Sequence, residues 1–168
     1  MKRCYLYLVA AILLFQSCST VNIASNKKAD YNKQPKKIYI VADCNKDAGT
    51  FCKNFTEGLK NNLSLKGITC DAYVRNQLSL ESEEDINKKI AAYNPEAALM
   101  IHQTQTGGGA NTFEFTLIDK DTQKPVWKCE LEVSIDSYTS MENDNVINKA
   151  IRTVLEKLAQ DKIIPGGA

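Results

Sequence analysis

Hydrophobic and polar residues alternate with different periods along this chain, and those periods predict its elements. Residues 36–43 contain a short continuous apolar run, which is typical of a central strand covered on both faces. Over residues 47–66, large apolar side chains recur at every fourth position, which predicts a helix with Gly67 as a natural stop. Residues 68–75 alternate between apolar and polar, which indicates a second strand.

The next segment repeats the change from helix to strand. Ser82, with Asp85 three residues later, is a variant of the capping box and predicts a helix to about Tyr93, before Pro95. Residues 97–106 then read as a third strand. Strands that alternate with helices predict parallel pairing through crossover connections.

The last third of the chain has a different pattern. Residues 112–119 and 126–136 both alternate, and the polar segment between them predicts an antiparallel hairpin with one wet face. Residues 143–160 carry apolar side chains at helical spacing, so this helix can cover the dry face. The predicted fold class is therefore α/β (α+β), in the order βαβαβββα. It has a mixed five-stranded sheet with parallel N-terminal strands, an antiparallel C-terminal hairpin and three helices, all in one domain over residues 36–164.

Phe113, Phe115 and Trp127 lie on the apolar side of the hairpin strands. They could line a groove for a ligand, but the final helix must pack on that side, so a role in the core is favoured.

The beginning of the chain is typical of an export signal. Lys2 and Arg3 precede an apolar run over residues 5–15, and this run is too short to cross a bilayer as a helix, which needs about twenty residues. Residues 14–18, Leu-Phe-Gln-Ser-Cys, resemble the lipobox of bacterial lipoproteins. The resemblance implies that residues 1–17 are a signal peptide and that Cys18 carries acyl chains such as palmitate. In an alternative interpretation, Cys18 is an ordinary residue near a conventional signal-peptide cleavage site.

Residues 18–35 are rich in Ser, Asn, Lys and Gln and poor in large apolar side chains. This composition predicts a lipidated flexible tether that holds the domain close to a membrane. Surface export signals of some lipoproteins are acidic, and no acidic cluster follows Cys18. The expected location is therefore the cell envelope, on the outer membrane facing the periplasm.

The charge balance argues against nucleic acid as a partner. The whole chain has 21 Lys and Arg against 20 Asp and Glu, a formal charge of +1, and loss of residues 1–17 removes two of the basic residues. Charges of both signs are interspersed and no basic face stands out, so no nucleic-acid binding is expected.

Four cysteines remain beyond Cys18, namely Cys44, Cys52, Cys70 and Cys129. Four cysteines permit three complete pairings. Because Cys44 ends the first strand and Cys52 lies in the first turns of the next helix, a disulfide between these two is predicted, with the other two as buried thiols. There is no Cys-x-x-Cys and only one histidine, so neither a metal site nor a cofactor is predicted.

The order of elements, the hairpin from residues 117–119 to residues 125–127, and the closing amphipathic helix together resemble small periplasmic lipoprotein domains. Relatives in shape include the lipoprotein activators of penicillin-binding proteins, the curli-secretion lipoprotein and the N-terminal domain of the Tol propeller protein. The resemblance covers residues 36–164 and implies assembly or docking in the envelope, with an envelope protein as partner, rather than catalysis.

Candidate binding residues gather at the end of the third strand. His102, Gln103 and Gln105 make it the most polar part of that strand, and Gly107 and Gly108 belong to the glycine turn that follows. The glycines do not lead into a helix, so a phosphate loop is not indicated. A catalytic histidine needs an oriented nucleophile, and no Gly-x-Ser-x-Gly supplies one.

The sequence therefore predicts a membrane-anchored envelope lipoprotein that acts as a non-catalytic binding or assembly accessory. An alternative is a protein that binds a small molecule or glycan fragment at the third strand and the glycine turn. A hydrolase is the weakest of the three.

Overall fold

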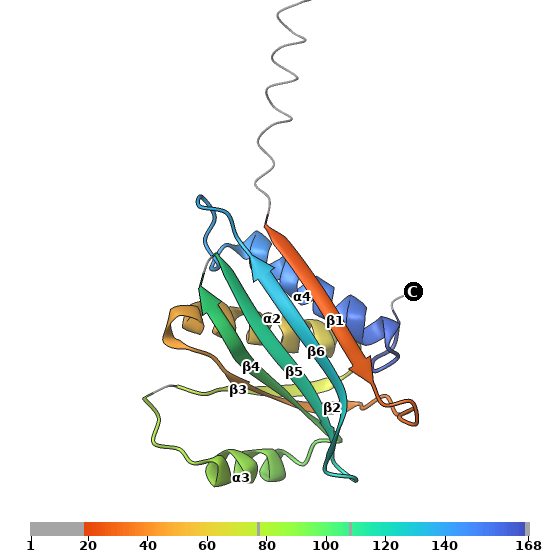
Figure 1. Cartoon of the computed structure of the whole chain (residues 1–168). Coiled ribbons are helices and arrows are strands. Elements are labelled where there is room, and N and C mark those ends of the chain that lie inside the picture. Colours follow the sequence, from red (N-terminus) through yellow and green to blue (C-terminus); the bar gives the residue numbers. More distant parts are fainter. Residues whose placement is uncertain (1–18, 77, 108, 167–168) are drawn as a thin grey trace, which may run out of the picture.

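The computed structural model describes residues 19–76, 78–107 and 109–166 of the chain (Figure 1). These residues form six strands, three α-helices and one short 3-10 helix. In chain order the elements are β1 Thr20–Lys27, β2 Lys37–Asp43, η1 Lys46–Ala48, α2 Gly49–Leu65, β3 Thr69–Val74, α3 Glu83–Tyr93, β4 Ala97–Gly107, β5 Ala110–Asp119, β6 Lys124–Ser134 and α4 Asp144–Gln160.

All six strands belong to one mixed sheet in the order β1-β6-β5-β4-β2-β3. Strand β2 is parallel to both β3 and β4, whereas β4, β5, β6 and β1 pair antiparallel in succession. The mixed α/β class expected from the sequence is thus confirmed. Because β2 lies between two parallel neighbours and is covered on both faces, its five central residues are all buried.

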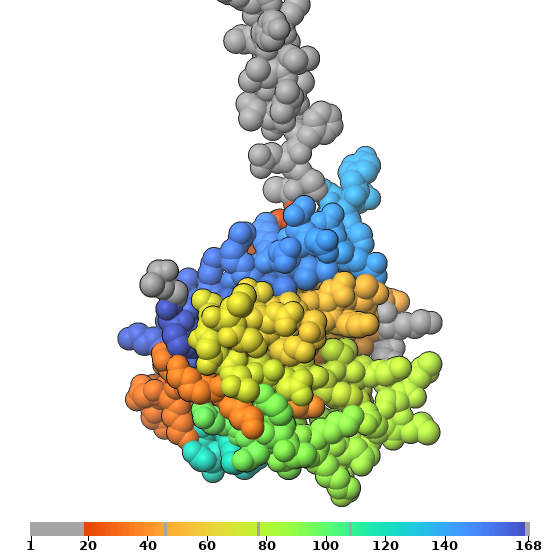
Figure 2. Space-filling view, turned by 180° about the vertical axis from the view of Figure 1, so that it is seen from behind, coloured from red at the N-terminus to blue at the C-terminus, as the bar shows by residue number. Residues whose placement is uncertain are grey.

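Helices cover the two faces of the sheet unequally. Helices α2 and α4 lie side by side on one face, as Figures 1 and 2 show, and α3 packs on the other face against β2. The main core lies under α2 and α4, where the ring centroids of Phe51 and Phe113 are 5.2 Å apart and those of Phe55 and Phe115 are 5.8 Å apart. Trp127 is also buried there, so the predicted core role of the hairpin aromatics is confirmed.

Strand β1 corrects the expectation of five strands and of a flexible tether over residues 18–35. Thr20–Lys27 pairs along its whole length with β6, and its side chains alternate between exposed and half-buried. Val21 and Ile23 pack against the main core, and Tyr31 is buried in it. The polar composition concealed this strand, because much of its stabilisation comes from backbone pairing with a strand about a hundred residues away.

Two helix ends follow the capping signals in the sequence. Gly67 has φ +77°, and Ile68 N–H donates to Leu63 C=O after the last turn of α2, so glycine occupies the left-handed position that it favours. At the start of α3, Ser82 Oγ accepts from Asp85 N–H while the Asp85 carboxylate accepts from Ser82 N–H.

Candidate ligand-binding site

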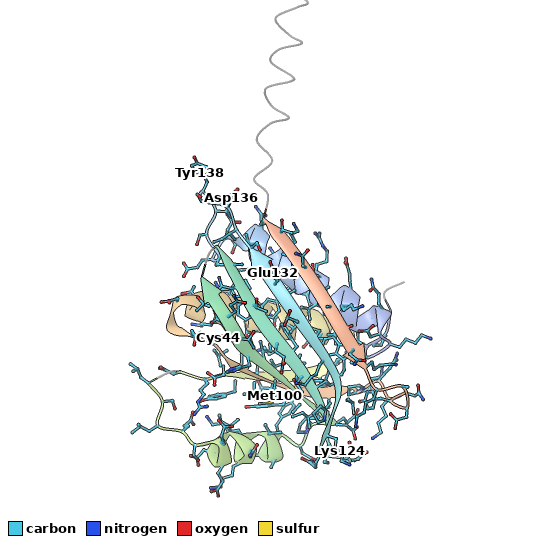
Figure 3. The ribbon with its side chains drawn as sticks, viewed as in Figure 1. Cys44, Met100, Lys124, Glu132, Asp136 and Tyr138 are labelled. Carbon is cyan, nitrogen blue, oxygen red and sulfur yellow. A yellow bond between two sulfur atoms is a disulfide. The ribbon has the colours of Figure 1, made fainter. Side chains whose placement is uncertain are left out.

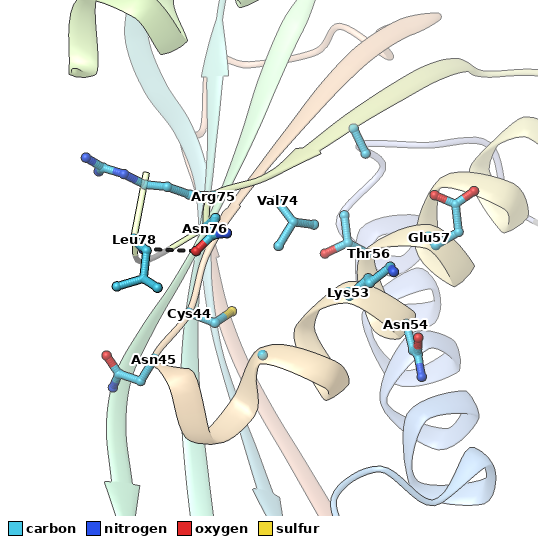
Figure 4. A pocket seen from close by; sticks show the side chains of 12 residues that line it. Cys44, Asn45, Lys53, Asn54, Thr56, Glu57, Val74, Arg75, Asn76 and Leu78 are labelled. Atoms are coloured by element: carbon cyan, nitrogen blue, oxygen red, sulfur yellow. Dashed lines mark hydrogen bonds between the residues drawn. The ribbon is translucent and has the colours of Figure 1, made fainter. Parts of the chain in front are cut away.

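A pocket of about 730 Å³ lies at the carboxyl ends of the parallel strands β2 and β3, beside the first half of α2 (Figure 4). We call it the α2–β3 pocket. Asn45 follows β2, Arg75 and Asn76 follow β3, and Lys53 and Thr56 line the pocket from the helix. Ligands of open α/β sheets bind outside the carboxyl ends of the strands, and the volume lies in the range of small-molecule sites.

The Cys44–Cys52 disulfide joins the end of β2 to the first turns of α2 beside this pocket. It is the pairing that the sequence predicts. Because the bridge links a strand end to a helix start across only eight residues of sequence, it holds two walls of the pocket in a fixed relation.

Arg75 organises the segment that lines the pocket after β3. Its guanidinium pairs with Asp43 at 3.4 Å and with Glu83 at 2.8 Å, and it also donates to the Glu81 carbonyl at 3.1 Å. These contacts tie the end of β2 to the start of α3 and to the loop between β3 and α3. The positive charge of Arg75 is therefore balanced within the protein.

The loop after Arg75 presents an exposed apolar side chain to the same pocket. Asn76 Oδ1 accepts a hydrogen bond of 2.9 Å from Leu78 N–H (Figure 4). Leu78 lines the pocket and is 89% exposed. Ala72 and Val74 of β3, both half-buried, supply further apolar wall.

The sequence-predicted candidates around the third strand do not form one site. His102 and Gln103 are adjacent in β4, so their side chains lie on opposite faces of the sheet, and the register shifts by one residue between Gln103 and Gln105. His102 is exposed, opposite Glu114 of β5, and Gln105 is exposed as well. Gly107 ends β4 with φ +125°, and Gly108 lies outside the described residues.

Gln103 has a structural role beside the α2–β3 pocket. It is only 4% exposed. Its Oε1 accepts a hydrogen bond of 2.9 Å from Asn45 N–H, and its Nε2 donates one of 2.8 Å to Asn111 Oδ1. The Gln103 amide therefore joins the segment after β2 to the middle of β4 and to β5. It also fixes Asn45, which lines the pocket just after the end of β2.

Sequence reasoning missed the residues that line the pocket. The sequence carries one signal for this site, the helical spacing that puts Lys53, Thr56 and Glu57 on one side of α2. Nothing in the sequence places Arg75 or Leu78 opposite them, because that depends on how α2 packs on β3.

The two cysteines outside the disulfide are free. Burial raises the pKa of Cys70 to about 12 and raises the pKa of Cys129 as well, so both remain thiols at neutral pH. Neither is therefore an activated nucleophile, since nucleophilic cysteines are thiolates.

Within the described residues, no group of three or more His, Cys, Asp or Glu side chains is placed to hold a metal ion. In the same part of the chain, no helix has both the length and the apolar character needed to span a membrane. The predicted lipidation site, Cys18, and the predicted signal peptide, residues 1–17, lie outside it.

Comparisons with known proteins place the fold but no family. No family model matches the chain, and no curated protein matches it. Among solved structures, the chain is similar to a PelC dodecamer from Paraburkholderia phytofirmans, with 17% identity and a TM-score of 0.53, over 83% of this chain and 97% of that one. A variant of the same dodecamer with one substitution matches with 17% identity and a TM-score of 0.54, over 84% of this chain and 98% of that one. At this identity the likeness shows a shared fold.

Proposed function

We propose that this protein is a lipid-anchored accessory of the cell envelope that works by binding other protein subunits, copies of itself included. The observation that carries the proposal is the shared fold with proteins solved as dodecamers, over nearly the whole length of those chains. The lipobox-like residues 14–18 support the anchor. The role is one of assembly, as the resemblance to small periplasmic lipoprotein domains also implies.

The position of β1 gives this anchor a geometric consequence. Strand β1 begins at Thr20, two residues after Cys18, so acyl chains on Cys18 would hold this end of the sheet against the membrane. The β6–α4 loop projects at the same end, and Tyr138 within it is 98% exposed (Figures 1 and 3). Tyrosine is favoured at membrane interfaces, where its ring is partly buried and its hydroxyl is hydrated.

The outer edge of β1 is suited to assembly. Lys28 N–H donates a hydrogen bond of 3.0 Å to Val126 C=O, which continues the β1–β6 register. In an antiparallel ladder the amides alternate in direction, so those of Val21, Ile23 and Ser25 point away from β6. An exposed edge of this kind can pair with a strand of another subunit.

Edge β3 is less open. The Asp71 carboxylate accepts 2.8 Å from Ala72 N–H at this edge, and so occupies one of its backbone donors. Charged side chains on an edge strand discourage pairing with other chains. Assembly through β1 is therefore the favoured mode.

The anchor is tested by mass spectrometry and fractionation. The mature protein should begin at Cys18 with acyl chains attached, and Cys18→Ser should move it from the membrane fraction to the soluble fraction. The matched control is Cys70→Ser, which changes a free thiol within the folded domain and should stay with the membrane. An unmodified Cys18 in the mature protein would refute the anchor.

Assembly is tested by light scattering of the detergent-solubilised protein over a range of concentrations. A discrete oligomer is expected. Val21→Pro should dissociate it, because proline lacks the N–H that points to the outer edge of the sheet, while the hydrogen bonds between β1 and β6 are kept. Val21→Ala keeps that amide and should leave the oligomer intact. A protein that remains monomeric throughout, with no specific partner after crosslinking in cells, would overturn the assembly role.

A further inference from the structure

Thr56 of α2 is a buried hydroxyl residue without a hydrogen bond. It is 1% exposed, and its Oγ1 has no hydrogen-bond partner among the described residues. By contrast, Thr153 Oγ1 in α4 donates 2.8 Å to Lys149 C=O, and in α2 itself Asn62 and Ser64 bond back to carbonyls four residues earlier.

A buried hydroxyl without a partner has a cost, because it has lost its hydrogen bonds to water and gained none in return. The usual remedy on a helix is a bond to the carbonyl four residues earlier, and Thr56 does not make it. Figure 4 shows the side chain of Thr56 turned toward the α2–β3 pocket. A molecule in this pocket is placed to supply the missing partner.

The charges that line the pocket leave one cation uncompensated. Glu57 pairs with Lys60 at 2.9 Å, and Arg75 pairs with Asp43 and Glu83. Lys53 also lines the pocket, but it makes no ion pair or hydrogen bond with any described residue. The free charge on the wall is therefore positive.

The start of α2 adds to this positive character. Its N-cap residue, Ala48, offers no side-chain hydrogen bond, and the first turn of the helix has no acidic residue, the nearest being the exposed Asp47 of η1. Gly49, the first residue of the helix, lines the pocket. The N-terminal end of a helix carries a partial positive charge that favours anions.

Part of the remaining wall is apolar, and the rest carries the amides of Asn45, Asn54 and Asn76. Ala72 and Val74 are half-buried, and the largely exposed Leu78 lines the same pocket. A ligand that covers these three side chains removes apolar surface from water. The pocket thus offers an apolar wall, one free cation and one hydroxyl.

We infer that the α2–β3 pocket binds a small organic anion, a carboxylate with a short aliphatic body. The carboxylate lies near Lys53 and the start of α2, Thr56 bonds to the ligand, and the aliphatic part covers Val74 and Leu78. This site is independent of the lipid anchor and of the assembly edge at β1, so each can fail without the other.

The test uses the ¹⁵N-labelled full chain in a nonionic micelle, titrated with hexanoate and followed by amide chemical shifts. Hexylammonium and 1-hexanol are the matched probes, because they keep the aliphatic body and change only the head group. Saturable shifts clustered at Thr56, Val74 and Leu78 with hexanoate, and weaker binding of both other probes, are expected.

Two variants assign the contacts. Lys53→Met should weaken hexanoate binding by roughly threefold to fivefold, the size expected of one solvent-accessible ion pair, whereas Lys124→Met at the start of β6 should leave it unchanged. Thr56→Val should also weaken hexanoate binding. Because the two variants change different contacts, one of them still tests the site if the other folds poorly. Equal binding of the three probes, shifts elsewhere on the surface, or an unchanged dissociation constant in Lys53→Met would overturn the inference.

Discussion

Trp127 donates a hydrogen bond of 2.7 Å from its indole Nε1 to the carboxylate of Asp161, which joins the buried face of β6 to the end of α4. Ser25 Oγ of β1 donates to the same carboxylate, and Lys157 lies 3.6 Å from it. One carboxylate therefore connects the edge strand, the neighbouring strand and the last helix. The buried indole N–H of Trp127 is satisfied in this way.

This carboxylate makes the stability of the protein dependent on pH. Burial alone would raise the pKa of Asp161, but the hydrogen bonds from Ser25 and Trp127 outweigh it and lower the pKa below its usual value. A lowered pKa in the folded state contributes stability above the unfolded pKa of about 3.9, and this stability is lost as the pH falls through the folded value.

We therefore predict that Asp161→Asn lowers the free energy of unfolding by about 1–2 kcal/mol at pH 7, because a neutral amide is a weaker acceptor than a carboxylate. The difference from the wild type should shrink below about pH 4. Urea titrations at pH 7 and pH 3 measure it, and exposed Asp30→Asn is the control. An Asp161→Asn effect of the same size at both pH values would contradict this assignment.

Strand β1 provides a second prediction. Ile23 is half-buried against the core, whereas the neighbouring Ala24 faces water. Ile23→Ala should lower the free energy of unfolding by about 1–2 kcal/mol, somewhat less than at a fully buried site. Ala24→Ser should have almost no effect. Denaturant midpoints measure both effects. If Thr20–Lys27 were a flexible segment, neither variant would change the free energy of unfolding.

The contrast between β1 and β2 explains how much of the fold the sequence predicts. The apolar run of β2 and the four-residue spacing in α2 are local signals, so both elements could be placed within two or three residues of their ends. Thr20–Lys27 has only Val21 and Ile23 as large apolar side chains. It is a strand because β6 presents a free edge to it, and no local pattern encodes that partner.

The candidate site was harder to predict for a similar reason. The sequence places His102 and Gln103 together, but the pleat of β4 sends them to opposite faces, and Gln103 is used inside the protein. The α2–β3 pocket instead combines Lys53 and Thr56 with Arg75, which lies on another element. Residues brought together only by the packing of a helix on a sheet carry no joint signal in one sequence.

The disulfide gives a third prediction. Replacing both Cys44 and Cys52 by Ser should lower the free energy of unfolding by about 2–3 kcal/mol, the value expected for a bridge that closes so short a loop. Cys70→Ser changes a free thiol and should have a much smaller effect. Guanidinium unfolding with and without reductant checks this, because reductant should destabilise the wild type but not the double variant. Equal sensitivity of the two proteins to reductant would mean that the bridge is absent.

Thr56 and Thr153 form a natural pair for the last prediction. Both are threonines on long helices, but the hydroxyl of Thr153 is bonded to Lys149 C=O and that of Thr56 has no partner in the described structure. Thr56→Val keeps the shape of the side chain and removes the unpaired hydroxyl, so it should raise the free energy of unfolding by about 1 kcal/mol. Thr153→Val removes a bonded hydroxyl and should not raise it.

The same Thr56→Val variant should bind hexanoate more weakly than the wild type. A residue that lowers the stability of the empty protein and strengthens its binding of a ligand is characteristic of a functional site, whereas a mere packing defect would change stability alone. Urea midpoints recorded with and without hexanoate measure both effects on one sample. A variant that is more stable and binds hexanoate as tightly as the wild type would show that the hydroxyl makes no contact with the ligand.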